Sequence, residues 1–460
     1  MQQQIKKKSI KIKYIDLFAG IGGFRLGFEN ACTNLKVIPS CVFTSEIKKT
    51  AVDTYINNFP GCRISGDITK IDASDIPKFD VLLAGFPCQA FSSAGTRKGF
   101  RDTRGTLFFD IERIIKHHMP SAFILENVEG LIKHDLQNKA DSIGKTLNII
   151  LNNLRKYGYK VNWELLNSAD FGLAQNRKRI FIVGTKKTLI PLDNFKKKHA
   201  KIKSIIEKRG HDSDEITNFS KILFKKYKAD DLYGKAIKDR RGGEDNIHSW
   251  DLELKGKTNK HQRQLLGELL KARRQKKWAE IKGIQWSDGM PLTENEIRTF
   301  CDIPDMKKNL EDLVDKGYLV LRHPKDVIEI SRGVITKSPR KDLEKGYDMV
   351  TGKLSFEVSN ILDPEGLTPT LVATDASRLA VIENNKLRRL SSKEMARLFG
   401  FPESFKLNVI KNNFFDLFGN SIAVSVVEKV AENLIKHHFL KEKYVKKISV
   451  RAETFQQFLL

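Results

Sequence analysis

The sequence IKYIDLFAGIGGFRLGFE, residues 12–29, joins an apolar run to a glycine-rich turn and then to an amphipathic segment. This order predicts a buried strand, a tight turn and a helix, which together open an α/β domain. Gly20, Gly22 and Gly23 let the turn run close to a ligand, and the amino terminus of the helix favours negative charge. The spacing F-x-G-x-G differs from the G-x-G-x-x-G of dinucleotide-binding proteins, so the turn alone leaves the ligand open.

Apolar runs continue to alternate with amphipathic stretches as far as Val183. The expected strands are residues 12–18, 37–46, 62–65, 80–85, 122–128, 159–166 and 179–184, and the expected helices are residues 23–30, 48–58, 107–118 and 140–157. Such alternation is typical of βαβ units. The prediction is a doubly wound, mostly parallel sheet with helices on both faces.

The composition points to a globular protein that binds a polyanion. The chain has 460 residues, and its 81 Lys and Arg exceed its 56 Asp and Glu to give a net charge of +25. Hydrophobic residues at 40% and charged residues at 30% exclude a disordered, collagen-like or coiled-coil chain. The length favours two domains. A positive charge of this size attracts a polyanion through counterion release, so nucleic acid is the expected partner.

The character of the sequence changes after Lys187, where basic and aromatic residues are interleaved. Residues 191–290 contain 25 Lys and Arg against 15 Asp and Glu. This pattern suits a nucleic-acid surface, although a solvated helical face would also show it. We therefore divide the chain into a first part at 1–187, a smaller basic domain at 188–370 and a segment at 371–460 in which α/β character resumes.

Residues 292–324 within the basic domain follow the order helix, turn, helix and strand. This order resembles a winged-helix unit, in which Lys307, Lys308 and Asn309 would point outward and contact DNA. An ordinary helical hairpin that only packs against its neighbours is the alternative.

The cysteines and the amino terminus favour a cytoplasmic location. Five cysteines show neither a C-x-x-C pair nor the spacing of a zinc site. The amino-terminal residues lack the apolar stretch of a signal peptide, and no stretch approaches the length of a membrane span. We expect a cytoplasmic monomer with no bound metal and no membrane partner.

Two acidic residues follow the next expected strands. Glu46 ends the second strand, where a carboxylate can bind both hydroxyls of a ribose, and Asp67 in GDIT can accept from an adenine amino group. A glycine turn with two acids fits an adenosine ligand. The alternative is that both acids only cap helices.

The fourth strand leads into AGFPCQAFSSAG, residues 84–95, which places Cys88 beyond the carboxyl end of a buried strand, where ligands bind in such sheets. A lone cysteine is more often a small core residue, but its position after Gly-Phe-Pro favours chemistry. The loop GTRKGFRDTRG, residues 95–105, carries Arg97, Lys98 and Arg104 and is typical of a lid that contacts phosphates.

Three further polar residues belong to the next strands. Glu126 in ENVEG stands where a carboxyl group can bond a ring nitrogen of a substrate, unless it is only a solvated cap. Arg177 and Arg179 in QNRKRIFIVG alternate and should project to the same side, so that Arg179 can reach the same site.

The motifs FAGIGG, GFPCQAFS, ENVEG, QNRKR and FGNS stand in the order found in the DNA (cytosine-5) methyltransferases, and the chain closely resembles the bacterial ones. The resemblance covers residues 12–187 and 368–435. It implies a Rossmann-like methyltransferase domain completed by the final segment, and a target-recognition domain at 188–370. It also implies S-adenosylmethionine as cofactor, bound by residues of the matching motifs, namely Phe18, Gly20, Gly22, Gly23, Glu46, Ile47, Asp67, Ile68, Pro87, Leu107, Asn420 and Ser421.

The reaction that the resemblance implies is methylation of carbon 5 of a flipped-out cytosine in a specific double-stranded DNA sequence, as in a restriction-modification system. Cys88 would add to carbon 6 as a thiolate, while protonated Glu126 bonds ring nitrogen 3, with Arg177 and Arg179 completing the catalytic set. Arg179 would lower the pKa of Glu126 and burial would raise it, and the sequence leaves open which effect is larger. The base that removes the carbon 5 proton is not identified.

Three other functions compete with this interpretation. An RNA-directed member of the family would have a shorter recognition region, and a catalytically silent DNA-binding homologue would have lost Cys88 or Glu126, which are present. A nicotinamide oxidoreductase would require the G-x-G-x-x-G motif that is missing from the first turn.

Overall fold

The computed structural model describes residues 10–86, 107–136, 141–207, 212–239, 246–286, 288–331, 334–350, 356–373, 375–407 and 414–440. The chain forms two compact units, and each is discontinuous in sequence. Unit 1 contains Met1–Asp212, Pro364–Ser377 and Ser391–Leu460, and unit 2 contains Ser213–Asp363 and Arg378–Leu390.

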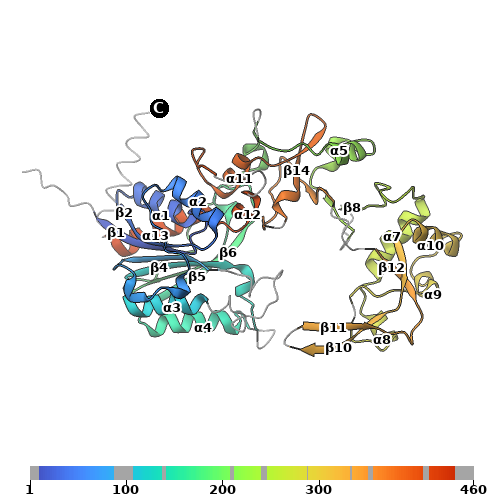
Figure 1. The fold of residues 1–460 in the computed structure, drawn as a ribbon, viewed down its shortest axis with the longest axis horizontal. Coiled ribbons are helices and arrows are strands. Elements are labelled where there is room, and N and C mark those ends of the chain that lie inside the picture. Colours follow the sequence, from blue (N-terminus) through green and yellow to red (C-terminus); the bar gives the residue numbers. More distant parts are fainter. Residues whose placement is uncertain are drawn as a thin grey trace, which may run out of the picture. The chain divides into compact units, whose positions relative to one another are not determined.

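Unit 1 is built on a six-stranded sheet with the order β2-β1-β3-β4-β6-β5 (Figure 1). The strands are β1 Lys11–Leu17, β2 Ile38–Ser45, β3 Val81–Gly85, β4 Ala122–Val128, β5 Lys160–Asn167 and β6 Lys178–Thr185. Strands β1 to β4 pair in parallel, while β6 is antiparallel to both of its neighbours. The predicted doubly wound, mostly parallel sheet is confirmed.

Alternate residues of the strands face two hydrophobic cores, one on each side of the sheet. Helices α1 (Gly23–Asn34) and α13 (Val424–Leu434) cover one face, where Phe28 and Val427 share a hydrophobic core with Tyr14. Helices α3 (Leu107–His118) and α4 (Lys145–Lys156) cover the other face, as Figure 1 shows. The remaining helices of unit 1 are α2 Lys49–Asn58, α11 Ser392–Phe399 and α12 Phe414–Gly419.

Helix α13 comes from the end of the chain and lies directly on α1. A Cβ atom added to Gly27 would stand 2.7 Å from Cβ of Val427, so only glycine allows this approach. Asn30 donates to Glu428 at 3.4 Å across the same contact. The final segment is therefore part of the core of unit 1.

Two expected elements differ from the structure. The expected strand at 62–65 is a single bridge between Ile64 and Thr44, because Gly61 and Gly66 on either side of it adopt positive φ and turn the chain away. The helix expected from residue 140 begins at Lys145 in the described part of that segment. Gly144 precedes it, where an added Cβ would lie 1.8 Å from the carbonyl oxygen of His134.

The described residues of unit 2 form two separate hydrophobic cores. The first belongs to a five-stranded sheet of order β15-β14-β13-β7-β8, packed with two helices. Its elements are α5 Thr217–Phe224, α6 Ala229–Leu232, β7 Ala236–Ile237, β8 Asn246–Ile247, β13 Asn360–Ile361, β14 Leu379–Glu383 and β15 Lys386–Arg389. Because β14 and β15 belong to this sheet, residues 378–390 are part of unit 2.

The second core of unit 2 is mainly helical. Its elements are α7 Lys260–Ala272, α8 Lys277–Ile281, α9 Glu294–Arg298, α10 Met306–Asp315, β9 Leu319–Arg322 and β12 Gly346–Met349, with a hairpin of β10 Lys325–Ser331 and β11 Val334–Pro339 between the last two strands. Helices α9 and α10 and strand β9 stand where the sequence predicts helix, turn, helix and strand.

Candidate active site

The glycine turn after β1 holds a backbone conformation that few other residues tolerate. Gly20 and Gly22 have φ values of +54° and +90°, and Phe18 just before them has φ of 55°. A Cβ atom at Gly22 would stand 2.3 Å from the ring of Phe59, whereas a Cβ at Gly20 would meet nothing within 4 Å. The turn is thus packed on its inner side and open above Gly20. Gly23 approaches the final segment, where an added Cβ would lie 3.2 Å from Oγ of Ser421.

Glu46 connects the end of β2 to this turn. Its Oε2 atom accepts from the Gly20 amide at 2.7 Å, and its Oε1 atom accepts from the amides of Ile47 and Lys48 at 2.9 and 2.8 Å. The side chain of Ile47 is exposed. The carboxylate therefore stands beside the open space above Gly20, which is where an adenosine-bearing ligand with ribose hydroxyls would need it.

Asp67 acts as a helix cap in this structure. Its Oδ1 atom accepts from the amide and the hydroxyl of Thr69 at 3.1 and 2.8 Å, and these hydrogen bonds lower the pKa of Asp67. Ile68 beside it is buried, and its carbonyl accepts from Arg113 at 3.0 Å. Asp67 thus caps the short helical turn at Ile68–Lys70.

The other predicted cofactor contacts lie on two separate segments. Asn420 is exposed and donates to the backbone carbonyl of Asp416 at 2.9 Å, whereas Ser421 is buried against the glycine turn. Leu107 begins α3 and is partly buried. Pro87, Cys88, Arg97, Lys98 and Arg104 lie outside the described residues.

Glu126 and Arg179 meet on the neighbouring strands β4 and β6. Nε of Arg179 lies 3.0 Å from Oε1 of Glu126, and the side chains expose only 13% and 12% of their surface. Burial raises the pKa of Glu126, and the nearby charges of Arg179 and Arg177 lower it by less. The question that the sequence left open is answered in favour of burial, so Glu126 holds its proton to a higher pH than an exposed glutamate.

Comparison with known proteins places this geometry in a family. A family model described as C-5 cytosine-specific DNA methylase matches residues 12–436. The chain belongs to that family.

Its relatives share almost the whole length of the methylase. It is 51% identical to the type II methyltransferase M.NlaIV of Neisseria lactamica and 50% identical to M.NgoBV of Neisseria gonorrhoeae, each over 92% of this chain and 99% of the relative. M.BanI of Aneurinibacillus aneurinilyticus is 40% identical over 93% of this chain and 97% of its own. The methyltransferase EhMeth of Entamoeba histolytica has a similar fold, with a TM-score of 0.50 at 15% identity over 94% of this chain and 99% of its own.

The methylase is therefore a DNA (cytosine-5) methyltransferase, and the relatives give no support to the RNA-directed or catalytically silent alternatives. The family implies S-adenosylmethionine as cofactor. The open glycine turn with the Glu46 carboxylate beside it fits that group. None of the described helices is long and apolar enough to cross a membrane. The described residues also contain no cluster of metal-binding side chains.

Arg177 of the methylase is placed differently from Arg179. Its buried guanidinium donates to the carbonyls of Leu371 and Ser421 at 2.7 Å each and to that of Gly419 at 3.3 Å. Both arginines were expected to serve the catalytic site directly. Residue 177 precedes the first residue of β6, so strand alternation does not fix the direction of its side chain. Its guanidinium instead connects the segment around Leu371 to the segment at Gly419 and Ser421.

Asn127 is a residue that the sequence reasoning missed. It is buried on β4 next to Glu126, and its Nδ2 atom donates to the carbonyl of Phe86 at 3.3 Å. Phe86 is the last described residue before Pro87 and Cys88. Asn127 thus holds the backbone from which the Cys88 loop starts. A polar residue inside the apolar β4 was the available signal.

The predicted DNA-contacting residues of α10 differ in exposure and in hydrogen bonding. Lys307 and Lys308 are exposed on the first turn of the helix. Asn309 instead donates through Nδ2 to the carbonyls of Pro304 and Asp305 at 2.9 and 3.2 Å, and its Oδ1 accepts from Asn259 at 3.2 Å. Asn309 is half-buried, and its amide stabilises the turn before α10, where the N-cap residue Asp305 makes no side-chain cap, so a contact of Asn309 with DNA stays a prediction.

Proposed function

We propose that this methylase transfers a methyl group to carbon 5 of a flipped-out cytosine within one specific double-stranded DNA sequence, as the modification enzyme of a restriction-modification system. The observation that carries this proposal is the buried Glu126 carboxyl, whose pKa is raised although Arg179 lies in contact. The names of the relatives, which are type II methyltransferases, support the restriction-modification role. We place the enzyme in the cytoplasm as a monomer.

Carbon 5 of cytosine is a poor nucleophile, so the ring must first be activated. In the proposed mechanism the Cys88 thiolate adds to carbon 6, and Glu126 donates its proton or a hydrogen bond to ring nitrogen 3. Gly85 pairs with Glu126 in the register of β3 and β4. Cys88 follows Gly85 by three positions in the sequence.

Arg179 is suited to contact oxygen 2 of the same ring while it orients Glu126. We assign Arg177 a positioning role, because its guanidinium holds Leu371 and Ser421 in place. When bound, S-adenosylmethionine would supply the methyl group. Loss of the carbon 5 proton to a base that is not identified, with release of the Cys88 thiolate from carbon 6, would then restore the ring and the free enzyme. Gly20, Gly22 and Glu46 would hold the adenosine portion of S-adenosylmethionine, with Ser421 beside the turn and Asp67 near the adenine.

Unit 2 is the proposed target-recognition part of the enzyme. We propose the bounds of this unit, Ser213–Asp363 and Arg378–Leu390, for the target-recognition part in place of 188–370. Arg97, Lys98 and Arg104 would contact DNA phosphates from the Cys88 loop, so their replacement would weaken binding to every DNA sequence alike. The target sequence would come from base contacts made by unit 2.

Replacement of Cys88 tests the mechanism directly. Cys88→Ala should abolish methyl transfer while leaving S-adenosylmethionine binding unchanged, because the thiol touches the base and not the cofactor. Bisulfite sequencing of plasmid DNA exposed to the wild-type enzyme identifies the target, and a duplex with 5-fluorocytosine at that position should trap the wild type covalently. Substantial turnover by the alanine variant would overturn the mechanism.

A further inference from the structure

The helical part of unit 2 has the chain order of a complete winged-helix module. Helix α7 is followed by the short helix α8, by the bridge residue Leu292, by α9 and α10, and then by β9, the β10–β11 hairpin and β12. Strand β12 pairs antiparallel with β9 on one side, and its Tyr347 pairs with Leu292 on the other. The hairpin therefore stands where such modules carry their wing.

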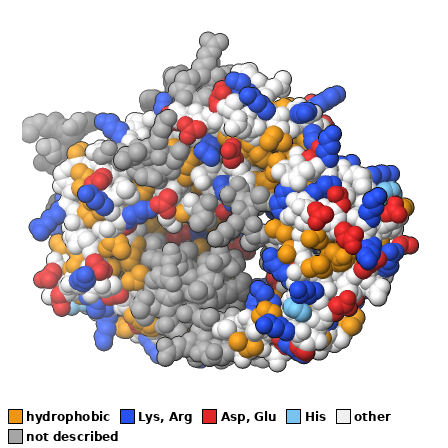
Figure 2. All heavy atoms as spheres, turned by 45° about the vertical axis from the view of Figure 1, so that its right-hand side comes forward, with side chains coloured by type: hydrophobic (Ala, Val, Ile, Leu, Met, Phe, Trp, Pro, Cys, Tyr) orange, Lys and Arg blue, Asp and Glu red, His pale blue; other side chains and the backbone are white. Residues whose placement is uncertain are grey.

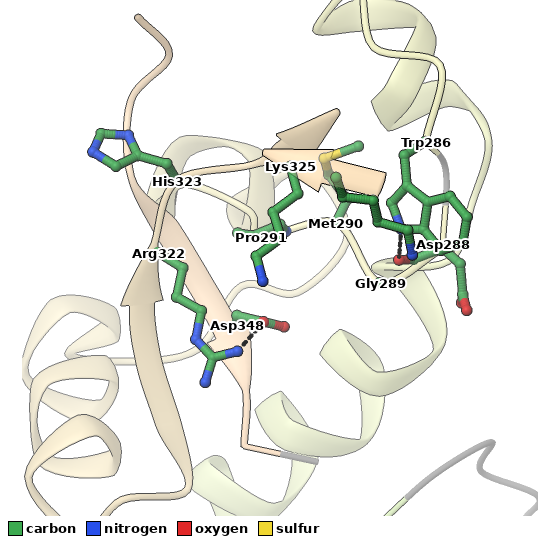
Figure 3. A pocket seen from close by; sticks show the side chains of 10 residues that line it. Trp286, Asp288, Gly289, Met290, Pro291, Arg322, His323, Lys325 and Asp348 are labelled. Carbon is green, nitrogen blue, oxygen red and sulfur yellow. Dashed lines mark hydrogen bonds and ion pairs between the residues drawn. The ribbon is translucent and has the colours of Figure 1, made fainter. Parts of the chain in front are cut away.

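A cavity of about 190 Å³ lies at the base of this hairpin. Its lining includes Trp286, Arg322, Lys325, Lys337 and Asp348. Figure 3 shows Arg322 and Lys325 extending their side chains toward Asp348, while the ring of His323 points away. The side chain of Arg322 is 48% exposed, and Lys325 and Lys337 are also exposed, so a large ligand can reach these groups.

The walls of the cavity are held by specific contacts. Asp326 accepts from the amides of Gln285 and Val327 at 2.9 and 2.8 Å, which fastens the hairpin to the loop before Trp286. The Trp286 indole donates to the carbonyl of Asp288 at 2.8 Å. Nζ of Lys337 lies 3.0 Å from the centre of the Trp286 ring. These contacts hold the backbone and the Trp286 ring around the cationic side chains in place.

The carboxylates around the cavity already have arginine partners. Buried Asp348 pairs with Arg273 at 2.9 Å and with Arg322 at 3.5 Å, and Asp288 lies 3.6 Å from Nε of Arg274. In the part of the chain that the structure describes, no ion pair is formed by Lys325 or Lys337. Burial lowers the pKa of Lys337, Asp288 raises it by less, and the charge of Lys325 lowers it by less still. The lining has three cationic side chains, Arg322, Lys325 and Lys337, against the carboxylates of Asp288 and Asp348, so it has an excess of positive charge.

On helix α10 of the module, basic and acidic residues are mixed. Helix α10 begins with Lys307 and Lys308, but Glu311, Asp312 and Asp315 follow on the same helix. Figure 2 likewise shows basic and acidic side chains intermixed over the visible surface. The base of the hairpin is distinguished by adjacent cations whose nearby carboxylates are already paired.

We propose that this cavity binds one backbone phosphate of the DNA duplex and so anchors the winged-helix module beside the target. The proposal rests on the proposed function, since it assumes that unit 2 contacts the DNA substrate. A phosphate oxygen can accept from the ammonium groups of Lys325 and Lys337 and from the planar guanidinium of Arg322. Such a contact fixes position without reading sequence, which leaves base recognition to other residues of unit 2.

The test compares two double variants of the full-length enzyme with equal changes in charge. Lys325→Ala/Lys337→Ala removes the proposed anchor, and Lys221→Ala/Lys225→Ala removes two exposed lysines at α5, beside the other core of unit 2. Binding is measured over a range of salt concentrations with a duplex containing the target and with a scrambled duplex of the same composition. Thermal unfolding of each variant verifies that it is folded.

The hairpin variant should bind both duplexes several-fold more weakly, with their affinity ratio unchanged. The slope of log K against log salt should become shallower by about 0.9, because one phosphate is no longer neutralised. Lys325→Arg/Lys337→Arg should restore the slope, and the α5 variant should leave it unchanged. The rate at saturating DNA should match the wild type for all variants.

Three results would overturn the anchor. The first is equal salt dependence for the hairpin and α5 variants, and the second is a selective loss of affinity for the target duplex, which would assign base reading to the cavity. The third separates binding of free phosphate from binding of DNA: the hairpin variant binds DNA as the wild type does, although millimolar inorganic phosphate protects Lys325 and Lys337 of the wild type from acylation. Failure of the proposed function is distinguishable, because the wild type would then not be trapped by 5-fluorocytosine.

Discussion

The Nε atom of Arg179 lies 3.0 Å from Oε1 of Glu126, and yet the pKa of Glu126 is raised. The two residues come from antiparallel neighbours, β6 and β4, so the sheet itself sets the contact. Burial of the carboxyl has a larger effect than the charge of its arginine partner. A proton donor for a ring nitrogen and a cation for the adjacent oxygen are thereby held side by side.

The pH dependence of methyl transfer should reveal the Glu126 proton. Because the raised pKa keeps Glu126 protonated to higher pH, activity should fall as pH rises through that pKa. Arg179 lowers the pKa of Glu126, so Arg179→Ala should shift this alkaline limb upward in pH while reducing the rate. Single-turnover rates at saturating DNA and cofactor would measure both effects. Glu126→Gln should lack the limb and be slower by about 10² to 10⁴. If the wild type, Arg179→Ala and Glu126→Gln all show the same alkaline limb, the limb does not come from the Glu126 proton.

Replacement of Arg177 should lower the free energy of unfolding more than replacement of Arg179 does. Arg177→Ala leaves three buried carbonyls without their donor, and each costs about 1 to 3 kcal/mol. Arg179→Ala should cost less because the unpaired Glu126 can remain protonated. Urea unfolding of the two variants would compare them, with Arg177→Lys as a partial rescue. If Arg177→Ala is as stable as the wild type, the positioning role assigned to Arg177 is wrong.

Cofactor affinity should depend on Glu46 more than on Asp67. Glu46→Ala removes the proposed ribose contact and also the acceptor of the Gly20 amide. It should weaken the binding of S-adenosylmethionine by about 1.5 to 3 kcal/mol. Asp67→Ala should have a milder effect because that side chain caps the turn at Thr69. Calorimetric titration would measure both. Unchanged affinity in Glu46→Ala would mean that the cofactor site is misplaced.

Exchange of target specificity should require both segments of unit 2. Residues 213–363 alone lack β14 and β15, which contribute Ala380 and Leu387 to the core of the five-stranded sheet. A chimera that receives 213–363 together with 378–390 should methylate the donor target, whereas 213–363 alone should give an insoluble protein. Bisulfite sequencing of plasmid from the host would identify the sequence methylated. A soluble chimera that retains the recipient's target would contradict the role of unit 2.

Much of unit 1 could be predicted because its strands and glycine turn have local sequence signals. The alternation of apolar runs gives β1 to β4, and the short spacing of Gly20 and Gly22 gives the turn. Contacts between distant segments could not be predicted in this way. Nothing near Arg177 in the sequence indicates that Leu371 and Ser421 will supply its acceptors, and Asn309 gives no local sign of its bond from Asn259.

The same limit applies to Glu126. Its position at the end of a strand is visible in the sequence, but its pKa depends on burial, which the whole fold determines. The boundary of unit 2 is also nonlocal, because β14 and β15 lie beyond the point at which α/β character resumes.

The packing of α13 on α1 affects how the protein can fold during its synthesis. Asn30 and Glu428 are 398 positions apart, so a ribosome adding about 5 to 20 residues per second needs roughly 20 to 80 s to make both partners. Throughout that interval the side of α1 around Gly27 lacks its native cover, α13. We expect chaperones or other segments of the chain to cover this side of the helix until the last segment emerges.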